Sequence, residues 1–266
     1  MTSHTSEKKS TGIGSLILAA CLLLFALLPI ADLAPIGGST EAREAHVARA
    51  IYQSGEFILP LRNGIIPSKP PLYHWLAAGA AHALGSFDEL AARLPSLIFG
   101  ALLVGLVMMR AYSISQRYCN GVEPKDTAIL AASSLTLLYG FSSLMLDCRV
   151  DMTMAFFVVS ALLYLLGRLE GQQPVTAPSL GQWVVFFSLC GFATLAKGPL
   201  GVVLPCLIAV VVLSFSLGFK TVIENCPKAI PGLLIFLSIA VPWYVLAAAK
   251  GQESFIGRQL VFENLL

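Results

Sequence analysis

The run LGQWVVFFSLCGFATLAKGPLGVVLPCLIAVVVLSFSLGF, residues 180–219, decides the fold of this chain. It holds two apolar segments, Leu180–Ala196 and Gly198–Phe219, which meet at the short turn Lys197-Gly198-Pro199. A helix needs about 20 apolar residues to cross the hydrocarbon layer of a membrane. The pattern therefore predicts two membrane-spanning helices that are joined by a tight turn.

Five further segments have a similar length and composition. The chain is 56% hydrophobic and only 12% charged, with a mean hydropathy of +0.78, whereas soluble domains carry about 25% charged residues. We therefore expect an all-α polytopic membrane protein with about seven transmembrane helices, in one membrane domain (13–266) after a tail (1–12). The five segments are Ile13–Ala31, Leu94–Met109, Ala128–Leu146, Met152–Gly167 and Ala229–Ala249.

The charged residues set the expected orientation and exclude several classes of protein. Lys8 and Lys9 before the first span place the tail in the cytoplasm and residues 32–93 in an external loop. A net charge of +2 without a basic stripe argues against a nucleic-acid partner. The six cysteines show no CxxC or Cys/His spacing, so neither a zinc site nor a disulfide framework is indicated.

The external loop is predicted to contain two short juxtamembrane helices. Ala45, Ala48 and Ile51 recur at helical spacing, and a hydroxyl of the Ser39-Thr40 pair is expected to cap that helix. The apolar stretch Pro71–Leu84 is too short to span and should be interfacial or re-entrant.

Four charged places lie at one predicted membrane face: Glu41-Ala42-Arg43-Glu44, Lys69-Pro70-Pro71, Asp147-Cys148-Arg149-Val150-Asp151, and Lys197. Each place alone also has an ordinary interpretation. In the same order, these are a solvated surface helix, a lysine that reaches lipid headgroups, an ion-paired turn and a helix end. Together they fit a site in which cations bind a phosphate and a partly desolvated carboxylate acts as a general base.

An ordered series of motifs carries a family resemblance. It comprises Thr40-Glu41-Ala42-Arg43, Ser54-Gly55-Glu56-Phe57-Ile58-Leu59-Pro60, Lys69-Pro70-Pro71-Leu72-Tyr73-His74-Trp75, Ala91-Ala92-Arg93-Leu94-Pro95-Ser96, Arg149-Val150-Asp151-Met152, Ala196-Lys197-Gly198-Pro199-Leu200-Gly201 and Val241-Pro242-Trp243. The chain resembles the ArnT-like membrane glycosyltransferases, a group that comprises lipid A aminoarabinose transferases and relatives of the protein O-mannosyltransferases.

The resemblance implies a GT-C fold in the bacterial inner membrane, with a site that faces the periplasm. Such an enzyme moves a sugar, with inversion, from a polyprenyl-phosphate carrier to a lipid A, glycan or protein acceptor, and membrane lipids surround it. The implied catalytic residues are Glu41 and Asp151. The implied substrate-binding residues are Arg43, Lys69, Tyr73, Arg149 and Lys197.

Two departures from the family pattern keep alternatives open. Thr40 replaces the aspartate of a usual Asp-Glu pair, so the base would be Glu41 or Asp151. Ser68 replaces an acidic residue that often precedes the Lys-Pro-Pro run, so no metal ligands are assigned, although a divalent ion is possible. The chain is also shorter than family members, as if their C-terminal part were missing. A non-catalytic remnant, a carrier-binding subunit and, less favoured, a transporter are the alternatives.

Overall fold

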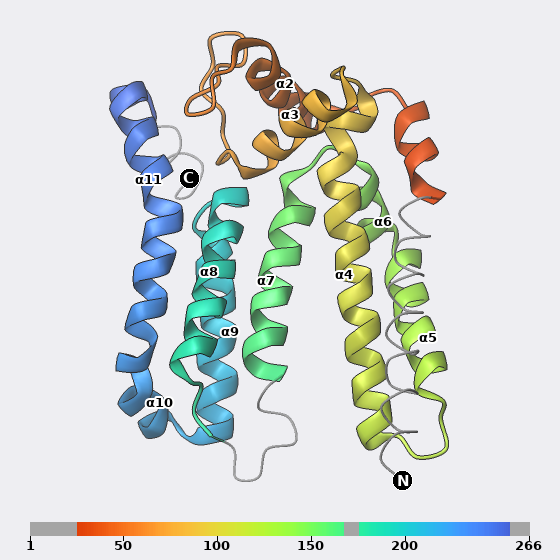
Figure 1. Ribbon diagram of the computed structural model, residues 1–266, viewed down its shortest axis with the longest axis vertical. Helices are drawn as coiled ribbons and strands as arrows, with labels where there is room; N and C mark the ends of the chain where they lie inside the picture. Colours follow the sequence, from red (N-terminus) through yellow and green to blue (C-terminus); the bar gives the residue numbers. More distant parts are fainter. Residues whose placement is uncertain (1–25, 168–175, 256–266) are drawn as a thin grey trace.

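The computed structural model describes residues 26–167 and 176–255, and these form a bundle of helices (Figure 1). Long, roughly parallel helices run between two ends of the bundle, and two shorter helices cover one end. The long helices are α4 (Glu89–Tyr118), α7 (Val150–Gly167), α8 (Leu180–Lys197), α9 (Leu200–Leu217) and α11 (Ile230–Phe255). The expected all-α membrane architecture is confirmed.

The number of membrane spans is close to the expected seven. Within the described residues, five helices are long and apolar enough to cross a membrane, or six if a bent pair counts as one span. Most of the predicted first span, Ile13–Ala31, lies outside the described residues, and residues 26–33 are helical. Large apolar side chains such as Phe215 (89% exposed) lie on the outer surface, as expected where lipid replaces water.

The bent pair lies where the sequence predicted one continuous span, Ala128–Leu146. Helix α5 (Pro124–Leu137) and helix α6 (Tyr139–Leu146) meet at an angle of 73°. Leu138 between them has an extended backbone (φ −68°, ψ 114°), and its carbonyl accepts the first hydrogen bond of the new helix from Phe141. The predicted segment ends at Leu146 as α6 does, but the helix begins four residues earlier, at Pro124, and it is not continuous.

Helices α2 (Ser39–Ser54) and α3 (Leu72–Leu84) cover one end of the bundle (Figure 1). Small side chains let them pack closely: Ala45 and Ala48 of α2 share a buried cluster with Tyr73 and Ala77 of α3. Ala92 of α4 belongs to the same cluster. Both helices were expected from the sequence. Their position places the segment between them directly over the ends of the spans.

The expected hydroxyl cap of α2 is wrong. The helix begins at Ser39, so Gly38 is its N-cap and no side chain caps it. Instead, Glu41 folds back, and its carboxylate accepts a 2.9 Å hydrogen bond from the backbone N–H of Gly37. An acidic residue in the first turn also complements the helix dipole. The start of α2 is thus stabilised by a residue that the sequence had suggested as catalytic.

The α8–α9 turn brings two spans into very close contact. Gly198 ends α8 with φ +96°, a conformation that side-chain-bearing residues rarely adopt. At Gly201 a Cβ atom would lie 2.3 Å from the backbone carbon of Ala193, so only glycine fits at this crossing. The two glycines therefore fix where Lys197, the last residue of α8, is presented.

Candidate functional site

A cavity of about 280 Å³ lies between α2 and the neighbouring ends of α7 and α8. Charged residues from four separate parts of the chain line it. Four cationic side chains and two carboxylates give the wall a net charge of +2. The lining residues are Thr40, Arg43, Glu44, Lys69, Arg149, Val150, Asp151 and Lys197.

Asp151 and Lys197 form an ion pair across two antiparallel helices. Asp151 lies in the first turn of α7 and Lys197 in the last turn of α8, so each charge also complements the dipole of its own helix. Both side chains are a little over one quarter exposed, at 28% and 27%. The pair therefore contacts the cavity rather than being sealed inside the bundle.

Lys69 and Arg149 supply positive charge from two connecting segments. Lys69 precedes Pro70 and Pro71, whose rings restrict the backbone that leads into α3. Arg149 precedes α7, and its Nε atom lies 3.4 Å from the carboxylate of Asp147. The N-terminus of α7 opens on the same cavity, so backbone N–H groups and cations converge there, which is the arrangement that binds anions.

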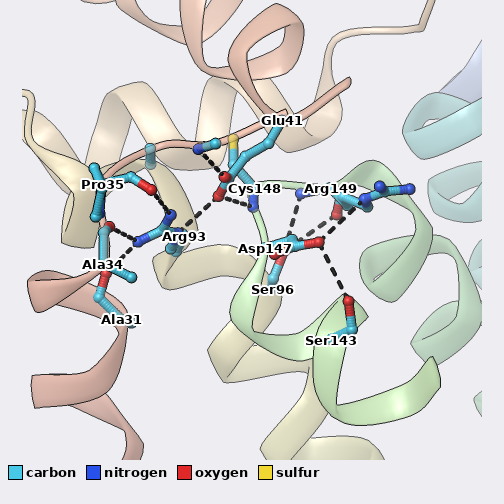
Figure 2. Close-up of polar contacts among 12 residues, drawn as sticks. Ala31, Ala34, Pro35, Glu41, Arg93, Ser96, Ser143, Asp147, Cys148 and Arg149 are labelled. Atoms are coloured by element: carbon cyan, nitrogen blue, oxygen red, sulfur yellow. Dashed lines mark hydrogen bonds and ion pairs between the residues drawn. The ribbon is translucent and has the colours of Figure 1, made fainter. Parts of the chain in front are cut away.

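Glu41 is not among the residues that line the cavity. It belongs to a polar network with Arg93 and Cys148 (Figure 2). Its Oε1 atom accepts hydrogen bonds from Arg93 Nε at 2.7 Å and from the backbone N–H of Cys148 at 3.0 Å. Burial favours the neutral form of this carboxyl, but Arg93 and the two N–H donors outweigh burial and hold the pKa of Glu41 below its ordinary value. The carboxylate has a structural partner on each oxygen.

Arg93 completes this network by binding the chain that precedes α2. Its guanidinium donates hydrogen bonds to the carbonyl oxygens of Ala31 (2.6 Å), Ala34 (2.5 Å) and Pro35 (3.2 Å) (Figure 2). Only 3% of Arg93 is exposed. One buried arginine therefore connects the end of the residue 26–33 helix to the start of α2. Glu41 extends the network to Cys148, in the loop before α7.

Tyr73 also lies away from the cavity. It is fully buried, and its hydroxyl donates a 2.8 Å hydrogen bond to the carbonyl of Ala92 and lies 3.1 Å from Ser96 Oγ. These contacts attach α3 to α4. Because burial is the largest influence, the pKa of Tyr73 is raised well above its ordinary value. The structure does not place this side chain where it would touch a ligand in the cavity.

The structure thus brings together five of the seven predicted site residues, and these are Arg43, Lys69, Arg149, Asp151 and Lys197. It does not bring Glu41 or Tyr73 into the cavity.

From the sequence, Glu44 was named in a charged place and His74 in a motif, but neither was given a role in the site. The structure places Glu44 in the cavity wall and His74 in contact with it. The spacing of Thr40 and Glu44, one helical turn apart on α2, could have indicated that both face the same side. The 30-residue separation between Glu44 and His74 gave no such signal.

Within the described ranges, no group of three His, Cys, Asp or Glu side chains is arranged to hold a metal ion. Ser68, at the position before Lys69, is 6% exposed and offers only a hydroxyl. We therefore derive no chemistry from a metal ion.

A known protein family matches the part of the chain that holds most of the cavity residues. The family model described as dolichyl-phosphate-mannose-protein mannosyltransferase matches residues 68–245. The match begins next to Lys69 and includes Arg149, Asp151 and Lys197, so it contains most of the cavity wall.

Sequence matches to curated relatives extend over most of this chain. An undecaprenyl phosphate-alpha-4-amino-4-deoxy-L-arabinose arabinosyl transferase of Pseudomonas fluorescens is 27% identical over 83% of the chain. A transferase with the same description from Aeromonas hydrophila is 24% identical over 84%, and an uncharacterized protein of Aquifex aeolicus is 26% identical over 85%. The chain spans 36%, 38% and 47% of the lengths of these three relatives, respectively.

Two solved structures share the fold. Both are ArnT from Cupriavidus metallidurans, one in the apo state and one bound to undecaprenyl phosphate. Each is 24% identical to this chain, with TM-scores of 0.72 and 0.74 over 94% and 95% of it. The matched region is 44% of the ArnT chain. The likeness shows a common arrangement of helices.

Proposed function

Because this chain belongs to the dolichyl-phosphate-mannose-protein mannosyltransferase family, we propose that it transfers a sugar from a polyprenyl-phosphate carrier to an acceptor. The acceptor is a lipid A, glycan or protein hydroxyl. In this proposal the chain is a glycosyltransferase-like domain of the bacterial inner membrane. Its tail lies in the cytoplasm, and the cavity faces the periplasm.

One observation carries the proposal: cations from four separate segments converge on one cavity at the ends of the spans. Arg43 comes from α2, Lys69 from the segment before α3, Arg149 from the loop before α7 and Lys197 from α8. A phosphate leaving group gains negative charge as its bond to the sugar breaks, and positioned cations stabilise that charge. A cavity next to the spans also suits a carrier whose long tail stays in the lipid.

The residues of the cavity receive separate proposed roles. Lys69 and Arg149 bind the carrier phosphate, and Arg43 lies at the cavity wall to hold the same anion or the sugar. Asp151 keeps Lys197 in the cavity through their ion pair. The acceptor attacks the sugar from the side opposite to the phosphate, so the configuration at the anomeric carbon inverts.

Binding and transfer can be measured separately on protein purified from its native membrane into nanodiscs. Lys69→Met should weaken binding of undecaprenyl phosphate at least about tenfold, since a hydrogen bond to a charged group contributes about 1.5–3 kcal/mol. Lys220→Met is the matched control, because Lys220 is exposed in α10 (Phe219–Asn225), at the other end of the bundle (Figure 1).

Transfer is then followed with the carrier-linked 4-amino-4-deoxy-L-arabinose that the relatives' description names, by mass spectrometry of lipid, glycan and protein fractions. A new glycosylated product with inverted configuration supports the proposal. Carrier binding without any product would instead favour a carrier-binding subunit, and equal binding by Lys69→Met and the wild type would contradict the assigned site.

A further inference from the structure

Glu44 connects the cavity to a buried histidine. Its Oε2 atom lies 2.8 Å from His74 Nε2, and its Oε1 atom accepts a 3.0 Å hydrogen bond from Arg43 Nε. Glu44 is 3% exposed and His74 only 1%, yet Glu44 forms part of the cavity wall. Each carboxylate oxygen has two acceptor positions, so the contacts with Arg43 and His74 leave positions for a ligand.

His74 keeps one ring nitrogen without a described partner. Nδ1 is buried, and no hydrogen-bond partner lies near it in the part of the chain that the structure describes. A buried polar atom without a partner costs free energy. A residue that only held Glu44 in place would need one hydrogen-bond donor, which Nε2 supplies, and would not need a second ring nitrogen. A histidine can also take up a proton near neutral pH, and this ability distinguishes it from a simple donor.

The two other carboxylates that the sequence suggested as bases have different surroundings. Glu41 lies outside the cavity, and both of its oxygens accept internal hydrogen bonds. Asp151 lines the cavity, but it is paired with the ammonium of Lys197, which offers protons and accepts none. Glu44 alone among the three lines the cavity and contacts a group that can share a proton.

We infer that Glu44 accepts the proton of the acceptor nucleophile during transfer, and that His74 is the positioning residue that shares this proton. The inference rests on the proposed transferase function. A bond forms between the acceptor oxygen and the anomeric carbon of the sugar. The bond from that carbon to the phosphate oxygen breaks, and its electron pair stays on the carrier phosphate. The proton of the acceptor hydroxyl moves to a Glu44 oxygen.

The charges around Glu44 fit this role. Burial favours its neutral form, but the hydrogen bond with His74, together with Arg43, outweighs burial and holds the pKa of Glu44 below its ordinary value. The carboxylate is therefore ionised at neutral pH and able to accept a proton. The other charged groups that line the cavity are Lys69, Arg149, Asp151 and Lys197.

The test compares Glu44→Gln, Glu44→Asp and His74→Gln in the wild-type protein, with Glu123→Gln as control. Glu123 is exposed and precedes α5, away from the cavity. General-base catalysis contributes roughly 10²- to 10⁴-fold. We expect Glu44→Gln to lower kcat by about this factor while undecaprenyl phosphate binds as tightly as before or more tightly. Glu44→Asp should recover part of the rate.

His74→Gln tests the shared proton, because glutamine keeps a hydrogen-bond donor but has no ring nitrogen that can accept a proton. We expect its kcat to fall at least about tenfold with carrier binding unchanged, whereas a merely structural partner, whose donor glutamine supplies, would leave kcat near the wild-type value. Glu123→Gln should match the wild type in both measurements.

The possible outcomes separate this inference from the proposed function. If the wild type transfers sugar and Glu44→Gln does so equally well, the inference is overturned and the function stands. If Asp151→Asn abolishes transfer while Glu44→Gln does not, Asp151 is the proton acceptor. If the wild type binds carrier but never transfers sugar, both are overturned. Should Glu44→Gln fail to fold, Glu44→Asp decides: a kcat at least tenfold lower with unchanged binding supports the inference, and an unchanged kcat contradicts it.

Discussion

The Glu41 carboxylate lies 2.7 Å from the Nε atom of Arg93, although the two residues are 52 positions apart in the chain. This contact joins the start of α2 to the first turns of the long helix α4. Through the Cys148 N–H it also reaches the loop that carries Arg149. The network therefore sets the position of one cavity wall relative to the next.

Arg93→Met is predicted to destabilise the protein strongly. The change leaves a buried carboxylate without its charged partner and three carbonyl groups without their donor. Breaking a buried ion pair by removing one partner costs about 3–5 kcal/mol. Thermal unfolding in detergent should show a clearly lower Tm. Arg62→Met, in the turn before α3, is the control and should unfold near the wild-type temperature; equal Tm values for both variants would refute the structural role.

Glu41→Gln should make stability less dependent on acid pH. Because the folded-state pKa of Glu41 is below its ordinary value, its ionised form stabilises the fold fully above that ordinary value. This contribution is lost as the pH falls through the lowered folded value. We expect the variant to be less stable than the wild type at pH 7 but to lose less Tm between pH 6 and pH 3. Tryptophan fluorescence during heating measures this, and Glu123→Gln should keep the wild-type slope.

Asp151→Asn should tighten carrier binding while Lys197→Met should weaken it. Removing the carboxylate raises the positive charge of the cavity and leaves the Lys197 ammonium available to a phosphate. We expect about a three- to tenfold lower Kd for undecaprenyl phosphate in Asp151→Asn, with a steeper dependence on salt. Titration in nanodiscs at two salt concentrations gives both values. A weaker affinity in both variants would mean that the intact pair, not the lysine alone, binds the anion.

Lys250→Met should loosen the segment between α2 and α3. Lys250 of α11 contacts Glu56, and this hydrogen bond is the main reason that the pKa of Glu56 is lowered. Without it, we expect several-fold faster cleavage after Arg62 by an arginine-specific protease, followed by mass spectrometry. Lys228→Met is the control, because Lys228 donates a hydrogen bond to the nearby Asn225 of α10. Unchanged cleavage in Lys250→Met would show that other contacts hold the segment.

The membrane-spanning helices could be predicted from the sequence because apolar length is a local property. The bend at Leu138 could not, since it interrupts an apolar run without a proline or a charge. The cap of α2 was mispredicted for a related reason. A hydroxyl near a helix start is a local signal, whereas the Glu41 carboxylate acts there because Arg93, far along the chain, holds it.

The cavity could be predicted in part for the same reason. Cations such as Lys69 and Lys197 lie next to glycine and proline turns and at span ends, so their face of the membrane follows from topology. The positions of the other candidate residues depend on which side chains are buried. Tyr73 sits in a recognisable motif but packs against α4, and Glu44 gains its importance only through His74. Neither contact leaves a trace in sequence spacing.

The contact between α11 and the segment that precedes α3 also affects the order in which the protein folds during synthesis. Trp243 donates a 2.9 Å hydrogen bond to the carbonyl of Ile58, 185 residues earlier in the chain. The ribosome therefore completes the early segment long before its partner helix exists. The contacts between α11 and the segment before α3 can therefore form only after α11 has been synthesised. Until then, the segment that leads to Lys69 lacks this hydrogen bond.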